Sequence, residues 1–410
     1  MSRRAVRAAS VVVFCAGGVA ACSAATPPFL TPTLPPGATS SAAVSPAERP
    51  MPSPGAGARD GLGAELDVGE IDSDLTGEVL EFASTGRSVV YSSGLLEDAG
   101  EEAAPDVFRY VPGPSAAPEL VWRNPSRDHS VVRVGGDLDT IAFVDVPLSG
   151  ERAWDLWLVA DGAAPVRLDT HPGGEDISSL VPSLSVFEPR IAWTAFDRGA
   201  TGPVSQLLVA EAPGWEPRVL LERPAAEAEL WLPSLHGNTL VFSEIRYSDG
   251  RSTDERTVHL LELGIPDAEP RRLDASGRAT MAVASADSVL WKETDPGFNM
   301  FNWGRMFEYD LATATISSIS TWPQEFVNYP SAGSRFVAWW GADAFSFGVY
   351  DLVRDRARLI ERHSSESQAN VLRPHVSGDL LVWMHVETPP GAASHRSLRY
   401  AYLPNAGADR

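Results

Sequence analysis

A short apolar run that ends in an aromatic residue recurs seven times in this chain of 410 residues. From one aromatic residue to the next, the spacing is 52, 50, 49, 49, 48 and 44 residues. A period of this length is typical of repeat architectures, in which one unit cannot bury its own apolar surface and adjacent units stack. The seven aromatic residues are Tyr91, Phe143, Trp193, Phe242, Trp291, Trp339 and Trp383.

Each repeat unit contains further segments with the pattern of β-strands. A first strand precedes the apolar run and is separated from it by a turn containing Gly, Asn, Asp or Ser, as hairpins require. A third strand and, in six units, a fourth strand follow the run, and no helical periodicity is found in this region. The predicted strands are first strands at 79–83, 131–134, 232–235, 281–284 and 373–376, third strands at 106–110, 155–159, 206–210, 257–261, 306–309, 348–352 and 398–402, and fourth strands at 119–122, 166–168, 218–221, 271–273, 315–319 and 358–360.

Four short antiparallel strands in each of seven units predict an all-β fold, a seven-bladed β-propeller, over residues 64–404. The seventh unit ends without a fourth strand. Residues 64–71 precede the first unit and alternate apolar with acidic side chains. We expect this N-terminal segment to supply the outer strand of the last blade and so to close the ring, and we expect residues 405–410 to be a disordered tail.

The second unit has a characteristic sequence. Residues 136–143 combine a turn with an apolar strand that ends in an aromatic side chain, residues 155–159 read Asp-Leu-Trp-Leu-Val, and residues 165–168 read Pro-Val-Arg-Leu. This sequence resembles the repeat of TolB-type β-propellers. The resemblance extends over residues 72 to 403. It implies an extracytoplasmic propeller that binds proteins or ligands.

The N-terminus has the pattern of a bacterial lipoprotein signal peptide, residues 1–21. Three arginines precede a short apolar stretch that ends in the lipobox-like sequence Val19-Ala20-Ala21-Cys22. Cleavage before Cys22 would leave its thiol to carry diacylglycerol, with palmitate as a further acyl group. An ordinary secretory signal is the alternative, and a partial match at Ser2-Arg3-Arg4 leaves open the Sec or the twin-arginine route.

Residues 22–63 are dense in Pro, Ala, Ser, Gly and Thr and offer little apolar surface to offset the entropy of ordering. We interpret them as a disordered, lipid-anchored linker that holds the propeller at the extracytoplasmic face of a bacterial cell membrane, in the periplasm or at the cell surface. The two cysteines, Cys15 and Cys22, both lie in the leader or at its end, so the mature propeller has no cysteine for a disulfide or a thiolate metal site.

The chain has 33 Lys and Arg against 54 Asp and Glu, a formal charge of −21. Binding to a phosphate backbone needs a basic surface, so we expect no nucleic-acid partner. We expect instead an envelope protein or a glycan, with the membrane reached through the lipid on Cys22.

Strand order in a propeller blade decides which loops share a face. The first-to-second and third-to-fourth turns lie on one face, and the second-to-third loops and blade crossovers lie on the other. Long, unequal loops on a rigid scaffold are where binding residues concentrate. We therefore predict the binding site on the second face, around the central channel, where the long loops would be 94–105, 196–205, 244–256, 292–305 and 386–396.

Aromatic residues gather in the predicted loop 292–305 and in the crossover 322–329. They could stack on a sugar or anchor a protein partner. The alternative is that they pack over the channel mouth and serve the core. The candidate ligand-binding residues are Phe298, Phe301, Trp303, Arg305, Trp322, Phe326 and Tyr329.

No motif in the sequence points to a specific chemistry. The loop 97–106 is acidic and could hold calcium, but it lacks the ligand spacing of known calcium loops, and the eight histidines show no metal-binding spacing. No Gly-x-Ser-x-Gly elbow, phosphate-binding loop or dinucleotide fingerprint occurs. We therefore name no catalytic or metal-binding residue and expect a non-catalytic protein- or glycan-binding module. The alternatives are a propeller hydrolase or lyase that acts on polysaccharide at the channel mouth, and a passive structural or sensory component of the envelope.

Overall fold

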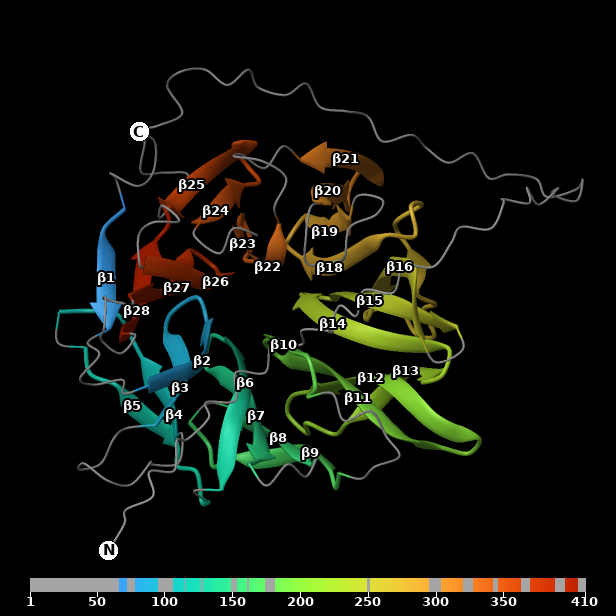
Figure 1. The fold of residues 1–410 in the computed structure, drawn as a ribbon, viewed down its shortest axis with the longest axis horizontal. Coiled ribbons are helices and arrows are strands. Elements are labelled where there is room, and N and C mark those ends of the chain that lie inside the picture. Colours follow the sequence, from blue (N-terminus) through green and yellow to red (C-terminus); the bar gives the residue numbers. More distant parts are fainter. Residues whose placement is uncertain are drawn as a thin grey trace, which may run out of the picture. The chain divides into compact units, whose positions relative to one another are not determined.

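The computed structural model describes most of the chain between residues 66 and 404. The described ranges are 66–71, 78–94, 106–114, 116–126, 128–148, 153–160, 162–173, 181–248, 251–294, 304–319, 327–341, 346–362, 369–387 and 395–404. The described residues contain 28 strands in seven four-stranded antiparallel sheets, which follow one another around a central axis (Figure 1). This confirms the predicted seven-bladed β-propeller.

The first four blades are built from consecutive strands. Blade 1 contains β2 (Glu78–Ser84), β3 (Val89–Gly94), β4 (Asp106–Tyr110) and β5 (Glu119–Trp122), and blade 2 contains β6 (His129–Asp137), β7 (Thr140–Pro147), β8 (Trp154–Ala160) and β9 (Val166–His171). Blade 3 contains β10 (Leu184–Phe187), β11 (Arg190–Gly199), β12 (Gly202–Glu211) and β13 (Arg218–Pro224), and blade 4 contains β14 (Ala228–His236), β15 (Thr239–Ser248), β16 (Arg251–Glu262) and β17 (Arg271–Arg272).

The last three blades complete the ring. Blade 5 contains β18 (Ala279–Ala284), β19 (Ser288–Thr294), β20 (Gly304–Asp310) and β21 (Thr315–Ile319), and blade 6 contains β22 (Asn328–Ala332), β23 (Phe336–Trp340), β24 (Ser346–Asp351) and β25 (Arg356–Arg362). Blade 7 contains β26 (Ala369–Ser377), β27 (Leu380–Glu387) and β28 (His395–Tyr402), with β1 (Val68–Ile71) as its outer strand.

The ring is closed by β1, the N-terminal strand. It pairs antiparallel with β28 in a register that sets Val68 opposite Ala401 and Ile71 opposite Leu398. Ile71 and Leu398 are both fully buried, while Val68 at the other end of β1 is 46% exposed. The alternation of apolar and acidic residues over 64–71 therefore predicted the closing strand, which the structure places at Val68–Ile71.

The recurring aromatic residues form the core between blades. All seven are at most 3% exposed, from Tyr91 in blade 1 to Trp383 in blade 7. Each lies on the second strand of its blade and packs toward the preceding blade. Phe143 lies 4.8 Å from Trp122 of blade 1 between ring centroids, and Trp383 lies 5.2 Å from Phe347 of blade 6. The period of the sequence is therefore the period of interblade packing.

Two of the segments predicted as long loops are hairpins. Strands β11 and β12 continue to Gly199 and Gly202, so most of 196–205 is paired backbone, and β15 and β16 continue in the same way through most of 244–256. Gly202 adopts a positive φ of 141°, which only a residue without a side chain accepts readily, so the chain turns there without a longer loop. The inner strands of blades 3 and 6, which the pattern did not predict, are β10 and β22.

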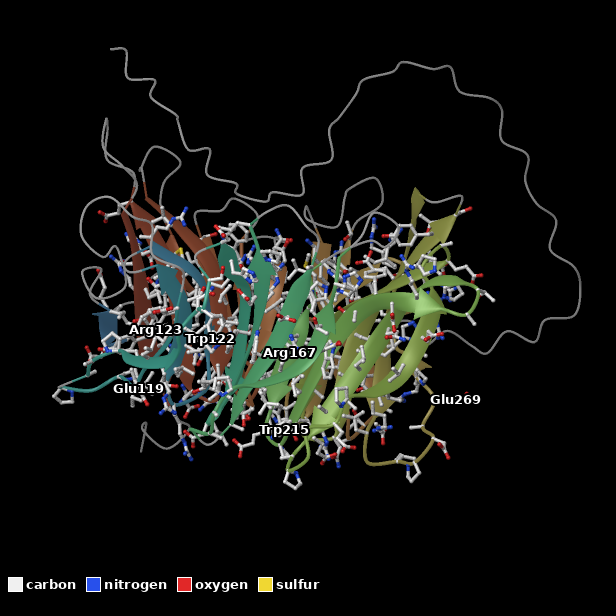
Figure 2. All side chains as sticks on the ribbon, turned by 90° about the horizontal axis from the view of Figure 1, so that it is seen from below. Glu119, Trp122, Arg123, Arg167, Trp215 and Glu269 are labelled. Carbon is white, nitrogen blue, oxygen red and sulfur yellow. The ribbon has the colours of Figure 1, made fainter. Side chains whose placement is uncertain are left out.

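The side view shows the turn face of the ring (Figure 2). Trp215 lies in the turn between β12 and β13, and Glu269 lies between β16 and β17, and both are at the same edge of the ring. The third-to-fourth turns thus share one face, as predicted. Among the described residues, no helix has the length and apolar character needed to cross a membrane.

Candidate functional site

The inner strands of all seven blades surround an axial channel of about 770 Å³. These strands are β2, β6, β10, β14, β18, β22 and β26, which lie nearest the centre of the ring in Figure 1. Their side chains and the turns that follow them form the wall. Because every blade contributes to it, the channel brings together residues that are distant in sequence, and a concave site of this kind is where a ligand is expected.

One position on the inner face of each blade repeats with the core aromatic residues. It lies ten residues before the aromatic residue of the same blade. The pairing register shifts beside this position in six blades, which is a β-bulge of the kind that redirects a side chain. In ring order the residues are Glu81, Arg133, Ser183, Leu232, Met281, Tyr329 and Arg373, and all except Ser183 line the channel. We call these seven residues the channel ring.

Four consecutive members of the channel ring adopt a left-handed backbone. The φ angles are 47° at Leu232, 56° at Met281, 45° at Tyr329 and 38° at Arg373. Residues other than Gly and Asn rarely adopt this backbone conformation, which costs about 1–3 kcal/mol for each residue. The same costly conformation recurs in blades 4 to 7, so it belongs to the repeat and sets the position of the side chains in the channel wall.

One arc of the channel ring is charged. Glu81 of blade 1 lies between Arg133 of blade 2 and Arg373 of blade 7. Its Oε1 accepts a hydrogen bond from Arg133 Nη1 at 3.2 Å and another from Arg373 Nη1 at 3.1 Å. The guanidinium of Arg373 also lies over the ring of Tyr329, 5.5 Å from the centroid. Four neighbouring members, on blades 6, 7, 1 and 2, therefore form one connected polar surface.

The opposite arc of the channel is apolar. It is lined by Leu184 and Val186 of blade 3, Leu232 of blade 4 and Met281 of blade 5. Leu184, Val186 and Leu232 are partly exposed to the channel, whereas Met281 is buried. A molecule in the channel would therefore meet two guanidiniums on one side and aliphatic side chains on the other.

At the end formed by the turns after the inner strands, the channel is lined by acidic groups, Asp137 and Asp379. Asp137 accepts hydrogen bonds from the backbone N–H of Glu188 at 3.0 Å and from Ser377 Oγ at 3.4 Å, and burial raises the pKa of its carboxyl above the usual range. The turns of blades 6 and 7 touch here, since a Cβ on Gly333 would lie 2.7 Å from the carbonyl oxygen of Gly378.

A serine and a histidine meet in the channel wall. Ser331 Oγ lies 3.4 Å from His375 Nδ1, donates to the carbonyl of Val376 at 3.2 Å and accepts from the N–H of Val376 at 3.0 Å. His375 is partly accessible from the channel but surrounded by protein, and this desolvation lowers its pKa to about 4. The imidazole is therefore neutral at pH 7.

The hydroxyl of Ser331 belongs to a repeated structural contact. Two residues after the channel ring, Ser185 and Ser234 accept the N–H of Leu235 and of Ala284, each at 3.0 Å. In all three cases the donor lies on the inner strand of the next blade. Ser331 thus joins blades 6 and 7 as its counterparts join blades 3 to 4 and 4 to 5, which explains its position without a nucleophilic role. Within the described part of the chain, no group of three His, Cys, Asp or Glu residues is arranged to hold a metal ion.

Two of the seven candidate ligand-binding residues lie in the described structure. Tyr329, predicted in a crossover, lies instead in strand β22 and in the channel wall. Arg305 lies on β20 with its side chain exposed, and no described contact joins it to Tyr329. Outside the described residues lie Phe298, Phe301, Trp303, Trp322 and Phe326, the lipidation residue Cys22, and the acidic loop 97–106 apart from Asp106.

The charged arc of Glu81, Arg133 and Arg373 was not among the residues predicted from the sequence. A signal for it was present, because each of these residues stands ten positions before a recurring aromatic residue. Counting from the aromatic residues would have singled out the channel ring. The pairing of its members depends on ring closure, which a linear spacing does not show.

Comparison with known proteins identifies the fold and no family. No family model matches the chain, and no curated protein does. The β-propeller domain of the Trilobed protease from Pyrococcus furiosus, described as having an open velcro topology, is 11% identical, covers 81% of this chain and 97% of that chain, and superposes with a TM-score of 0.56. Oligogalacturonate lyase from Vibrio parahaemolyticus is 11% identical over 83% of this chain and 98% of that chain, with a TM-score of 0.50.

TolB from Acinetobacter baumannii is also among the similar structures, with 11% identity over 67% of this chain and 80% of that chain and a TM-score of 0.38. The β-propeller fold that the resemblance implied is confirmed by the seven four-stranded sheets and by the match to the Trilobed protease domain. Identities this low describe a shared architecture, so they assign no activity to this chain.

Proposed function

We propose that the protein is a lipid-anchored β-propeller at the extracytoplasmic face of a bacterial membrane, where it binds a ligand in its axial channel without altering the ligand chemically. The observation that carries the binding role is the channel itself. Its volume of about 770 Å³ falls within the range of small-ligand sites, and its wall combines aliphatic surface with a few converging polar groups. The proposed anchor rests on the lipobox-like sequence before Cys22 and on the linker of residues 22–63.

The polar groups of the channel support binding more than catalysis. The hydroxyl of Ser331 already donates to the carbonyl of Val376, so its proton serves a contact between blades. The guanidiniums of Arg133 and Arg373 have hydrogen-bond donors and no acceptor. Such groups orient and select a ligand but do not transfer protons to it.

A lyase or hydrolase acting on an acidic polysaccharide is the second candidate. It is favoured by Asp137, whose raised pKa is the property that a general acid needs, in a channel that is also lined by three arginines, Arg87, Arg133 and Arg373. The similarity in fold to a structure named oligogalacturonate lyase is compatible with this candidate but does not argue for it, because a shared fold hosts many activities.

Binding and turnover are separated by one experiment on the purified full-length protein in detergent. A panel of neutral and acidic oligosaccharides and short peptides is screened by microscale thermophoresis, and each ligand is then recovered and weighed by mass spectrometry. We expect ligands that are bound and recovered unchanged. The Leu232→Trp variant, which places a bulky indole in the apolar arc of the channel, should abolish binding, whereas Val353→Trp, on an exposed turn of blade 6, should not.

Two results would overturn the proposal. Shortened or unsaturated products that disappear in Asp137→Asn would establish the enzyme. Binding that survives Leu232→Trp would move the site out of the channel to another surface.

A further inference from the structure

We infer that the channel selects ligands that carry a carboxylate and an apolar face, and that Arg133 and Arg373 hold the carboxylate. This inference rests on the proposed function and specifies its ligand class. The two guanidiniums approach each other across blade 1, where both bind the same oxygen, Oε1 of Glu81. In the described part of the channel wall, no other acidic side chain binds two positively charged side chains.

The guanidiniums keep most of their donors for a ligand. Each offers five N–H groups, and the contact with Glu81 uses Nη1 of each. Arg133 Nη1 also donates to the carbonyl of Val132 at 2.8 Å. Among the residues that the structure describes, no protein acceptor is bonded to Nε or Nη2 of either arginine. The side chains of Arg133 and Arg373 are 41% and 48% exposed, and both residues line the channel.

The local charge is opposite to that of the protein. Two arginines against Glu81 leave a net charge of +1 on this arc, in a chain whose formal charge is −21. A carboxylate is the anion whose two oxygens match the planar guanidinium fork, and such pairs form parallel charge-assisted hydrogen bonds. The overall negative charge of the protein disfavours anions elsewhere, so selection for a carboxylate is concentrated at this arc.

Contacts within the arc fix the arginines before a ligand arrives. Arg373 lies against the face of Tyr329, and a cation over an aromatic ring is held there by the ring quadrupole. Its backbone is constrained by the left-handed bulge. Glu81 sets the separation of the two guanidiniums. A preorganised pair of this kind loses little entropy when it binds, which favours affinity.

The apolar arc selects the chemistry of the part of the ligand that lies beyond its carboxylate. Leu184, Val186 and Leu232 offer aliphatic surface on the other side of the channel. A ligand whose carboxylate reaches the arginines would therefore place an apolar face there. Aliphatic and aromatic acids have such a face, and so does the C–H face of a uronic acid sugar. The shared chemistry is a carboxylate on a body with an apolar side.

Matched ligand pairs test the inference by isothermal titration calorimetry on the full-length protein in detergent. Phenylacetate is compared with phenylacetamide, N-acetyl-leucine with its amide, and D-galacturonate with its methyl ester. We expect each pair's acid to bind at least tenfold more tightly than its neutral partner wherever either binds. The pair that binds best identifies the source of the carboxylate as an aromatic acid, a peptide-like acid or an acidic sugar.

Variants of the charged arc provide the second part of the test. Arg133→Gln and Arg373→Gln should each weaken acid binding at least tenfold and leave neutral ligands unchanged. Arg373→Lys, which keeps the charge but not the fork, should lie between Arg373→Gln and the wild type. Glu81→Gln removes the competing carboxylate and should strengthen acid binding. Arg123→Gln is the control, because Arg123 is 75% exposed at the rim of blade 1.

The outcomes separate this inference from the proposed function. If neutral ligands bind in the channel as well as acids, or if acid binding is unchanged in both Arg→Gln variants, the inference is wrong while the channel remains a binding site. No binding by any of the three acids at millimolar concentration also overturns it. If Leu232→Trp leaves every bound ligand in place, the proposed function itself fails.

Discussion

The indole N–H of Trp383 in blade 7 donates a hydrogen bond to Oε2 of Glu361 in blade 6, 2.6 Å away. Trp193 of blade 3 donates to Oδ2 of Asp169 in blade 2 in the same way, at 2.8 Å. In both cases a carboxylate on the outer strand of one blade accepts a hydrogen bond from the core tryptophan of the next blade. Because both indoles are buried, losing the acceptor would leave a donor unpaired at a cost of about 1–3 kcal/mol.

The contact at Glu361 predicts a pH dependence of stability. His385 Nδ1 lies 2.9 Å from Glu361 Oε1, and this hydrogen bond is the main reason that the pKa of His385 is raised. The native protein therefore binds this proton more tightly than the unfolded chain does. The resulting stabilisation is complete below the unfolded pKa of about 6.5 and is lost as the pH rises through the native pKa.

Urea unfolding at pH 5.5 and pH 8.5 tests this dependence in the wild type and in His385→Gln. The difference in the free energy of unfolding between the wild type and the variant should be smaller at the higher pH. An advantage that is the same at both pH values would show that His385 does not titrate in this way.

The serine contacts between inner strands predict a loss of stability without a change in fold. Ser234→Ala removes the acceptor for the N–H of Ala284, which is buried, and should lower the free energy of unfolding by about 1–3 kcal/mol. Ser334→Ala is the matched control, since Ser334 is exposed, and should change it by less than about 0.5 kcal/mol. If denaturant titrations give the same change in the free energy of unfolding for both variants, the Ser234 contact does not stabilise the fold.

The chain's single lysine predicts a second pH effect, opposite in sign to that of His385. Lys292 is fully buried, its Nζ donates to Asn328 Oδ1 at 2.8 Å, and burial lowers its pKa to about 7. Between this value and the unfolded pKa of about 10.5, the unfolded chain binds more protons, so stability rises with pH. From pH 7 to pH 9, the wild type should gain about 2 kcal/mol relative to Lys292→Met. A difference that stays constant in urea unfolding would contradict the lowered pKa.

Closure by β1 predicts that one side chain near the N-terminus stabilises the whole ring. Ile71 is fully buried against the last and first blades, and Ile71→Ala should lower the free energy of unfolding by about 2–5 kcal/mol. Val68→Ala, at the exposed end of the same strand, should change it by less than about 0.5 kcal/mol. If Ile71→Ala is as stable as the control, β1 is not needed to hold the ring closed.

The lipobox-like sequence predicts how the protein is held at the membrane. Cys22→Ala removes the thiol that would carry the lipid, so the protein should move from the membrane fraction to the soluble fraction. Fractionation of cells that express each form, followed by immunoblotting, measures this. Membrane retention of the variant would contradict a lipid anchor at this residue.

The repeat made the architecture predictable because interblade packing needs one large aromatic side chain in every blade. Trp291 and Trp383 are core residues for that reason. The closing strand around Ile71 was predictable on a different ground, because its alternating sequence matches a half-buried strand. The inner strand β10 shows no alternation of buried and exposed side chains, since all four of its residues are partly buried, and the pattern did not predict it.

The charged arc was harder to predict than the fold. Glu81 and Arg373 are 292 residues apart in sequence and meet only when the ring closes. Tyr329 was selected as part of an aromatic crossover, and it lies in the channel because a bulge in β22 places it there. Local pattern predicts strands and their buried faces, whereas the contact between the last and the first blade depends on closure of the ring.

The position of a bound carboxylate is the most direct test of the channel as the ligand-binding site. The measurement is a crystal structure of the full-length protein with whichever acid binds most tightly in calorimetry. We predict carboxylate oxygens within hydrogen-bonding distance of both Arg133 and Arg373, with the apolar part of the ligand against Leu232. A ligand bound to the outer loops, with the two arginines contacting only Glu81, would contradict the channel as the functional site.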